Sequence, residues 1–322
     1  MVDLSIIIPV YNCAPYLKKG FERLKPLYQL VISFEIIYVN DGSTDYSLNV
    51  LKEIESNNDF VKVVTQENQG SSGARNTAIE IANGNYIQFL DADDFLDIDK
   101  IIYLLKLANL EDLDLLGYRL DYVNENDEVI GRRKKHPLPY NQLMTGSDAL
   151  IKGYHPSSIC VFLFKRRLLI DKNLRIYPRI THMDVEFMTR VMINVEKVIF
   201  KDIVAYHYLQ RPGSITKPQT KEKLESMLFD EVIISKLIKD NIKNYDITDK
   251  KLIEVIRTNS NSTVWYLLHR FFSKPNELDK VFKKKCIQSL KEKGVYPIRG
   301  PLKTNFQKIT TPIMQFWFKI IL

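Results

Sequence analysis

Four apolar runs in the first third of the chain alternate with amphipathic stretches, and this alternation constrains the fold more than any other feature. The apolar runs are Leu4 to Val10, Phe34 to Val39, Phe60 to Val64 and Tyr86 to Leu90. Near-continuous apolar runs of this length are typical of strands that are buried on both faces. The stretches between them have helical spacing and are Pro15 to Leu30, Asp45 to Ser56 and Ser71 to Ala82. A helix between each two strands predicts a parallel sheet with helices on both faces.

Polar residues follow these runs where the predicted strands end. Asn12 comes after the first strand, Asp41 ends the second, and Asp91-Ala92-Asp93-Asp94 follows the fourth. Ligands of parallel sheets bind beyond the carboxyl ends of the strands, so we expect these side chains to share one rim. Carboxylates this close repel one another, and a divalent cation would offset the repulsion. The alternative for the three aspartates is a helix N-terminus, where Asp caps unpaired N–H groups.

The rim residues divide between these two interpretations. For Asp41 we favour ligand binding, because a carboxylate accepts hydrogen bonds from a base edge or a sugar hydroxyl. For Asp45 we favour a structural role in the turn or at the start of the next helix. Asp94 is expected to cap a helix that starts near Ile98. The polar turn from Gln66 to Gly73 suits either phosphate binding or the end of a strand.

Composition excludes several other classes of protein. The chain has 322 residues, a formal net charge of +7 and 45% hydrophobic residues, which suits a soluble globular protein with a sizeable core. No apolar stretch approaches the roughly 20 residues that cross a bilayer, and the N-terminus lacks a basic segment before a hydrophobic one. The three cysteines are far apart, as in a reduced cytosolic protein. The basic run Arg132 to Lys135 has no interleaved aromatic residues, so we do not expect nucleic acid as a partner.

Four motifs resemble a known family. They are Ser5-Ile6-Ile7-Ile8-Pro9-Val10-Tyr11-Asn12, Val39-Asn40-Asp41-Gly42-Ser43-Thr44-Asp45, Gly73-Ala74-Arg75-Asn76 and Phe89-Leu90-Asp91-Ala92-Asp93-Asp94. Their order and spacing resemble the family 2 glycosyltransferases. The resemblance implies an α/β fold of GT-A type, with a mostly parallel central sheet flanked by helices and a C-terminal helical region.

We expect the chain to be divided into three parts. Residues 1–218 would form the GT-A catalytic domain, with a nucleotide-sugar-binding half at 1–118 and an acceptor half at 119–218. A hairpin is expected from Leu120 to Arg133. Residues 219–293 read as helices, and residues 294–322 form a basic, aromatic tail without an acidic residue. That tail suits contact with an anionic bilayer, docking onto the protein's own core, or a dimer interface.

The resemblance also implies roles for individual residues. Asp91 would meet the donor's ribose and Asp93 a divalent cation, Mn²⁺ or Mg²⁺. The residues implied for the nucleotide-sugar donor are Pro9, Tyr11, Asp41, Asn68, Arg75, Asp91, Arg211 and Ser214. Asp184 matches the position of the family's general base, with Glu186 as the second choice. Met183 departs from the family pattern, which has Glu there.

Together these features predict an inverting, metal-dependent glycosyltransferase. Its donor would be a nucleotide-diphosphate sugar, most simply UDP-linked, and its acceptor a hydroxyl of a glycan or lipid-linked saccharide in cell-surface polysaccharide biosynthesis. The expected location is the cytoplasm, including the inner face of the membrane. A glycosidase also uses paired carboxylates but would not need the rim aspartates. A nucleotide-sugar-binding or scaffold protein that has lost its base is the other alternative, and Met183 favours it.

Overall fold

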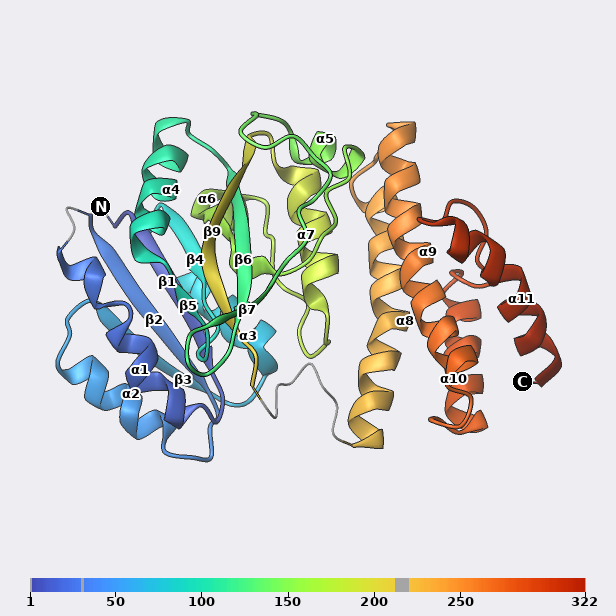
Figure 1. Ribbon diagram of the computed structural model, residues 1–322, viewed down its shortest axis with the longest axis horizontal. Helices are drawn as coiled ribbons and strands as arrows, with labels where there is room; N and C mark the ends of the chain where they lie inside the picture. The colour runs from blue at the N-terminus through green and yellow to red at the C-terminus, as the bar shows by residue number, and fades with distance from the viewer. Residues whose placement is uncertain (1, 30–31, 212–219, 322) are drawn as a thin grey trace. The chain divides into compact units, whose positions relative to one another are not determined.

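The chain forms two compact units in the computed structural model, which describes residues 2–29, 32–211 and 220–321 (Figure 1). Unit 1 comprises Met1–Arg179 and Val191–Pro212, and unit 2 comprises Ile180–Arg190 and Gly213–Leu322. Helix α7 (Met183–Asn194) contributes residues to both. Residues 180–190, which we expected in the catalytic domain, therefore group with the C-terminal helices.

Unit 1 is built on a nine-stranded sheet. Its strands are β1 (Leu4–Val10), β2 (Phe34–Asp41), β3 (Val61–Gln66), β4 (Tyr86–Phe89), β5 (Phe95–Leu96), β6 (Leu115–Val123), β7 (Val129–Arg132), β8 (Phe162–Lys165) and β9 (Val198–Leu209). They lie in the order β3-β2-β1-β4-β8-β6-β9-β5, with β7 paired to β6. The pairings from β3 to β4 are parallel, as is β6 with β9. Strand β8 enters antiparallel between β4 and β6, so the sheet is mixed beyond β4.

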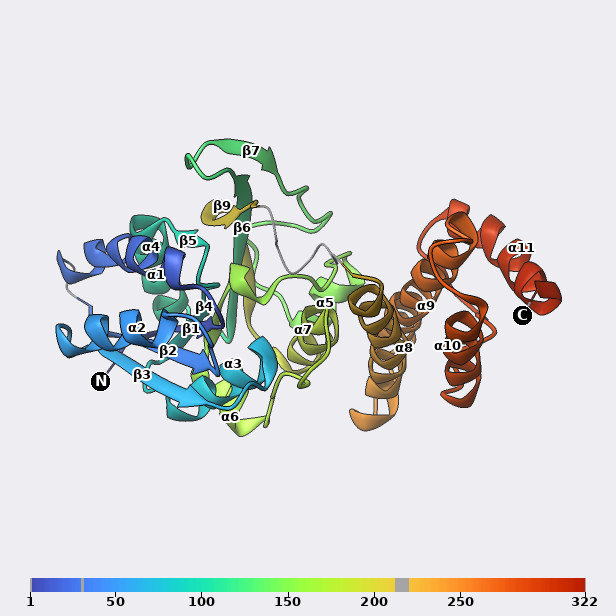
Figure 2. The same cartoon turned by 90° about the horizontal axis from the view of Figure 1, so that it is seen from below.

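Helices cover both faces of this sheet. They are α1 (Ala14–Glu22), η1 (Lys25–Gln29), α2 (Ser47–Ser56), α3 (Gly70–Ile81), α4 (Ile98–Leu110), α5 (Gly146–Ile151), η2 (Ile159–Val161) and α6 (Arg166–Asp171). Helices α1 and α4 lie on one side of the strands and α6 on the other (Figure 2). Ile7, Ile37 and Phe89 of the three central parallel strands are fully buried, because both faces of their strands are covered.

The predicted alternation of strands and helices in the first third is confirmed, with one shorter helix. We expected a helix from Pro15 to Leu30, but α1 ends at Glu22 and a 3₁₀ turn follows. Pro26 lies in that turn, and its missing N–H cannot continue an α-helix. The predicted hairpin is also confirmed as β6 and β7.

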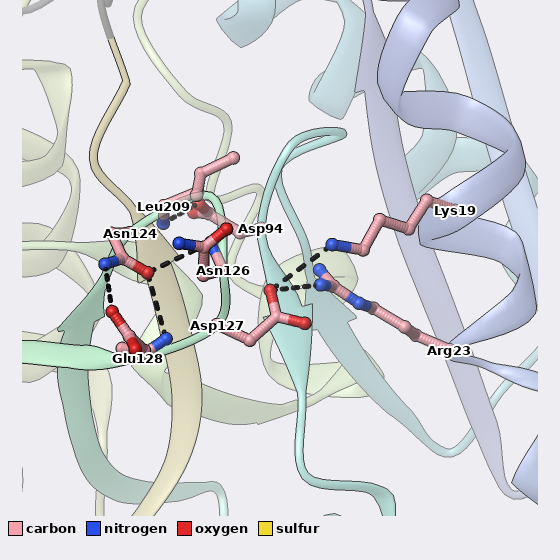
Figure 3. A network of polar contacts seen from close by, with 8 residues as sticks. All are labelled: Lys19, Arg23, Asp94, Asn124, Asn126, Asp127, Glu128 and Leu209. Atoms are coloured by element: carbon pink, nitrogen blue, oxygen red, sulfur yellow. Dashed lines mark hydrogen bonds and ion pairs between the residues drawn. The ribbon is translucent and has the colours of Figure 1, made fainter.

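The tip of this hairpin is fastened to the first helix. Asp127 accepts hydrogen bonds from Arg23 at 2.5 Å and Lys19 at 3.4 Å, and Asn124 Oδ1 accepts the N–H groups of Asn126 and Glu128 (Figure 3). The side-chain oxygen of Asn124 therefore shapes the turn. Two cations, Lys19 of α1 and Arg23 directly after it, fix the position of the turn.

The C-terminal part of unit 2 consists of α8 (Lys221–Asn244), α9 (Lys250–Ser273), α10 (Lys280–Glu292) and α11 (Asn305–Ile321). Side chains of Thr220, Asp249 and Asp279 cap the first three helices, each by accepting a backbone N–H of the first turn. Their apolar faces meet in a core that includes Phe271 and Met314, both fully buried. Among the helices that the structure describes, none combines the length and apolarity needed to cross a membrane.

Candidate active site

The carboxyl ends of β1, β2 and β4 lie at one edge of the sheet because these strands are parallel neighbours. The loops after β1 and β2 are joined by hydrogen bonds. Asn12 Oδ1 accepts the N–H of Thr44 at 2.8 Å, and Ser43 Oγ accepts the N–H of Asn12 at 3.1 Å. Asn12 itself has φ of +52°, a left-handed conformation that Asn adopts more readily than most residues. These contacts fix the backbone directly after Tyr11, which is about half exposed at the rim.

Asp45 has the structural role that we favoured. Its Oδ1 accepts the N–H of Ser47, the first residue of α2, at 2.9 Å. Its Oδ2 accepts the N–H of Ala14, the first residue of α1, at 3.2 Å. One carboxylate therefore satisfies unpaired N–H groups at the start of two helices.

Asp41 lies at the end of β2 with only 2% of its surface exposed. Its Oδ1 accepts hydrogen bonds from Gln66 Nε2 at 2.7 Å and from the N–H of Gln69 at 2.9 Å. Gln66 ends β3 and is the register partner of Asp41. This contact of Asp41 was not predicted, although both residues stand at the ends of predicted strands. The turn that contains Asn68 approaches closely, since a side chain at Gly42 would lie 3.0 Å from its backbone nitrogen. Within this turn, Asn68 Oδ1 accepts the N–H of Gly70. Pro9, also predicted on this side of the rim, is half-buried in β1.

Arg75 projects from α3 and is 4% exposed. Its Nη2 donates to Asp91 Oδ1, and the N–H of Asp91 donates to the hydroxyl of Tyr206 at 3.3 Å. A buried guanidinium therefore holds one oxygen of Asp91 in place. Arg75 and Asp91, each predicted to bind the donor, therefore lie in direct contact.

Asp93 is held by a second arginine. Arg211 Nε donates to Asp93 Oδ2 at 2.7 Å, and the Arg211 guanidinium lies 4.6 Å from the ring centre of Tyr16 on α1. Tyr16 was not anticipated, and its contact fixes the plane of the guanidinium through a cation–π interaction. Ser214, the other predicted phosphate contact, lies outside the described residues.

Asp94 does not cap the helix that follows, which corrects our expectation. The cap of α4 is Asp97, whose Oδ1 accepts the N–H of Lys100. Asp94 is buried and accepts the hydroxyl of Tyr206 at 2.5 Å and the N–H of Leu209 at 2.8 Å (Figure 3 shows the Leu209 contact). Burial raises the pKa of Asp94 well above its usual range, and the charges of Asp91 and Asp93 raise it further.

Asp184 lies in the first turn of α7 and is half-buried. Glu186, our second choice for the base, is 2% exposed and bound in two places by Arg190, through Nε at 2.5 Å and Nη2 at 2.7 Å. Both carboxylate oxygens of Glu186 are therefore engaged by a guanidinium on the same helix, an arrangement typical of a structural ion pair. Met183 is buried.

The segment before Asp184 is tied to α8 within unit 2. Thr181 donates to Asp230 Oδ2 from both its N–H, at 2.8 Å, and its hydroxyl, at 2.7 Å. His182 Nδ1 lies 2.6 Å from Glu231 Oε1, and this hydrogen bond raises the pKa of His182. Asp230 and Glu231 were not predicted, because nothing in the pattern of α8 distinguishes them from solvent-exposed carboxylates.

The oxygen ligands at the rim suit a hard divalent cation. Mg²⁺ and its analogues are commonly held by one or two carboxylates, with substrate phosphates completing the shell. Asp93 fits this requirement, because a carboxylate has about four lone-pair sites and can accept Arg211 and a cation on different oxygens. Within residues 2–29, 32–211 and 220–321, no group of three or more His, Cys, Asp or Glu side chains is arranged to hold a metal ion.

The mixed sheet, its helical cover and the rim define a glycosyltransferase of GT-A fold. The chain belongs to glycosyl transferase family 2, whose family model matches residues 5–171. An uncharacterized glycosyltransferase of Haemophilus influenzae is 44% identical over 231 residues, which cover 68% of this chain and 83% of that protein. YibD of Escherichia coli is 29% identical over 66% of this chain and 63% of its own length. EpsJ of Bacillus subtilis is 30% identical over 70% of this chain and 66% of its own length. The chain thus spans less than two thirds of YibD and EpsJ.

Solved structures agree with this fold. Staphylococcus aureus TarS 1–349 in complex with UDP has a TM-score of 0.66 and 17% identity, and the match covers 99% of this chain and 87% of that one. A mannosyltransferase of Pyrobaculum calidifontis in complex with GDP-Man and Mn²⁺ has a TM-score of 0.52 and 14% identity, covering 98% and 84%. At these identities the likeness establishes the fold alone.

Proposed function

We propose that the protein moves a sugar from a UDP-linked donor to a hydroxyl of a glycan or lipid-linked saccharide, with inversion at the anomeric carbon. The observation that carries this proposal is the pairing of the two rim carboxylates, Asp91 and Asp93, with Arg75 and Arg211. Two carboxylates and two arginines at the carboxyl ends of the strands form an arrangement that suits a nucleoside diphosphate and its cation. The complexes of TarS with UDP and of the Pyrobaculum enzyme with GDP-Man and Mn²⁺ support the donor class.

In this proposal the donor's nucleoside lies against the half of the rim made by β1 and β2. Tyr11 offers an exposed flat face to the nucleobase beside Pro9, and Asp41 accepts hydrogen bonds from its edge. Asn68 lines the same side, and Asp91, held by Arg75, accepts from the ribose. The fixed loops mean that little conformational freedom is lost when the nucleoside binds.

Positive groups beside the donor's diphosphate stabilise it as the leaving group. When bound at Asp93, Mn²⁺ or Mg²⁺ supplies positive charge to the phosphate oxygens that become the leaving group. Arg211 turns from Asp93 toward the same oxygens, and Ser214 donates to them. The arginine keeps an electrostatic partner in both arrangements, so the exchange costs little.

Asp184 is the proposed general base. Its carboxylate takes the proton of the acceptor hydroxyl as that oxygen attacks the anomeric carbon from the face opposite the diphosphate, so one displacement suffices. The substitution of Met183 for the family's Glu removes one neighbouring negative charge. His182 supplies a cation nearby, and its raised pKa keeps it charged over a wider pH range.

The test is turnover of UDP-sugars in the presence of Mn²⁺, after a panel of donors has been screened by thermal stabilisation. Asp184→Asn should lower turnover by about 10² to 10⁴-fold, the usual contribution of a general base, with unchanged donor affinity. Glu186→Gln is the matched control on the same helix and should retain the chemical step. Equal rates for wild type and Asp184→Asn would contradict the base assignment. Metal-dependent donor binding without transfer to any acceptor would favour a binding protein instead.

A further inference from the structure

Helix α11 has two apolar faces, and within the described part of unit 2 one of them is packed against other helices while the other is exposed. The inner face packs on α9, where the rings of Phe318 and Phe271 lie 6.2 Å apart and Trp265 Nε1 donates to Thr310 Oγ1 at 2.9 Å. Gln315 Oε1 also accepts the N–H of Ile298 at 2.7 Å. These contacts fix the rotation of the helix about its axis and so determine which side chains point outward.

The outer face is a continuous apolar stripe. Its members, with exposed fractions, are Ile309 (66%), Ile313 (54%), Phe316 (66%) and Ile320 (67%). Phe306 (57%) lies at the start of the stripe, where its ring also packs against Trp265 and His269 of α9. The stripe residues recur at intervals of three and four residues, so they lie along one side of the helix. Large side chains exposed together in this way mark a surface that binds something.

Charge around the stripe indicates its partner. Lys308 and Lys319 are exposed and lie about three turns apart on the same edge of the stripe. Arg299 and Lys303 precede the helix, and residues 294–322 contain no Asp or Glu. A second copy of this face would bring lysines against lysines without a carboxylate to pair them. An anionic surface, in contrast, complements the stripe and its border.

We propose that the outer face of α11 binds the surface of an anionic phospholipid bilayer. The apolar side chains enter the boundary between headgroups and acyl chains, to a depth of about 5–10 Å, while the lysines contact lipid phosphates. The inference is independent of the transfer chemistry. If the proposed function holds, this contact brings the transferase to the surface where lipid-linked acceptors lie.

The test is cosedimentation of the full chain with vesicles of phosphatidylglycerol mixed with phosphatidylcholine, and with phosphatidylcholine alone. Wild type should bind the anionic vesicles, and added salt should weaken the binding. Ile309→Glu and Ile313→Glu should each lower the partition coefficient by roughly tenfold or more, because each removes one apolar side chain from the lipid. Lys308→Gln and Lys319→Gln should each lower it by about fivefold on anionic vesicles only.

Leu110→Glu is the matched control, because Leu110 is 81% exposed at the end of α4, in unit 1. It should bind as wild type does. All these positions are exposed, so the variants should unfold at the wild-type temperature, which scanning calorimetry checks. Unchanged vesicle binding by Ile309→Glu and Ile313→Glu would overturn the proposal. So would the absence of vesicle binding together with a wild-type dimer that Ile313→Glu dissociates, because the face would then bind a second copy.

Discussion

Arg211 Nε donates a hydrogen bond to Asp93 Oδ2 at 2.7 Å, across 118 residues of sequence. Arg211 follows β9, whereas Asp93 lies between β4 and β5. Strand β5 pairs with β9, and this pairing brings the two side chains together. The carboxylate that we propose for the cation therefore has a positive group beside it. We make four predictions for the rim and for the segment before Asp184.

Asp93→Asn should abolish the gain in UDP affinity that Mn²⁺ produces, because an amide is a weak ligand for a hard cation. Isothermal titration calorimetry with and without Mn²⁺ measures the gain, and we expect the two affinities of the variant to differ by less than about twofold. Asp202→Asn is the control, since Asp202 also pairs with an arginine, Arg119 at 2.8 Å, but on another part of unit 1. A metal-dependent gain retained in Asp93→Asn would refute the assignment.

Arg75→Met should weaken both the fold and donor binding, because it leaves Asp91 without the guanidinium that orients it. Breaking a buried ion pair costs several kcal/mol, but Asp91 is partly exposed, so we expect a loss of about 1–2 kcal/mol in the free energy of unfolding. Urea denaturation measures this loss. Lys18→Met, which removes the same charge from an exposed pair with Glu53, should change stability by less than about 0.5 kcal/mol. Equal effects of the two substitutions would count against a special role for Arg75.

Asp94→Ala and Asp97→Ala separate two aspartates that the sequence does not distinguish. Asp97→Ala removes the cap of α4 and should cost about 1 kcal/mol. Asp94→Ala removes the acceptor of two buried donors, Tyr206 and Leu209, and should cost about 2 kcal/mol or more. Asp94→Asn keeps an acceptor and loses the charge that burial disfavours, so it should be milder than Asp94→Ala. If Asp97→Ala were the more damaging of the two alanine variants, the observed capping would be contradicted.

The pair of His182 and Glu231 should make stability depend on pH. Glu231 raises the pKa of His182 in the folded protein, so the pair stabilises fully below the unfolded pKa of about 6.5 and less as the pH rises through the higher folded value. Asp184 and Asp230 act in the same direction, whereas burial opposes them. His182→Gln should therefore be destabilising at pH 5 to 6 and approach wild type at alkaline pH. Thermal unfolding across this range measures the difference. A constant difference at all pH values would show that the pair is not responsible.

The alternation of elements was predictable because it rests on local properties. Buried strands must be apolar, and helices between them must be amphipathic, so Leu4–Val10 and Ser47–Ser56 were recognisable from their own residues. Parallel pairing then places the carboxyl ends of these strands on one rim. The position of Asp41 and Asp91 on that rim could therefore be predicted without knowing their contacts. The early end of α1 also has a local signal, Pro26, which the prediction of a helix to Leu30 did not take into account.

The fold class, the family and the rim on which the carboxylates lie could all be predicted from the sequence, because the periodicity and the ends of strands depend on consecutive residues. The hydrogen-bond partner of each carboxylate, in contrast, is known from the tertiary structure alone. Asp91 meets Arg75 16 residues away, Asp93 meets Arg211 118 residues away, and Asp94 meets Tyr206 112 residues away. These partners come together through helix packing and strand pairing. The spacing of residues along the chain does not show which distant side chain will lie within hydrogen-bonding distance.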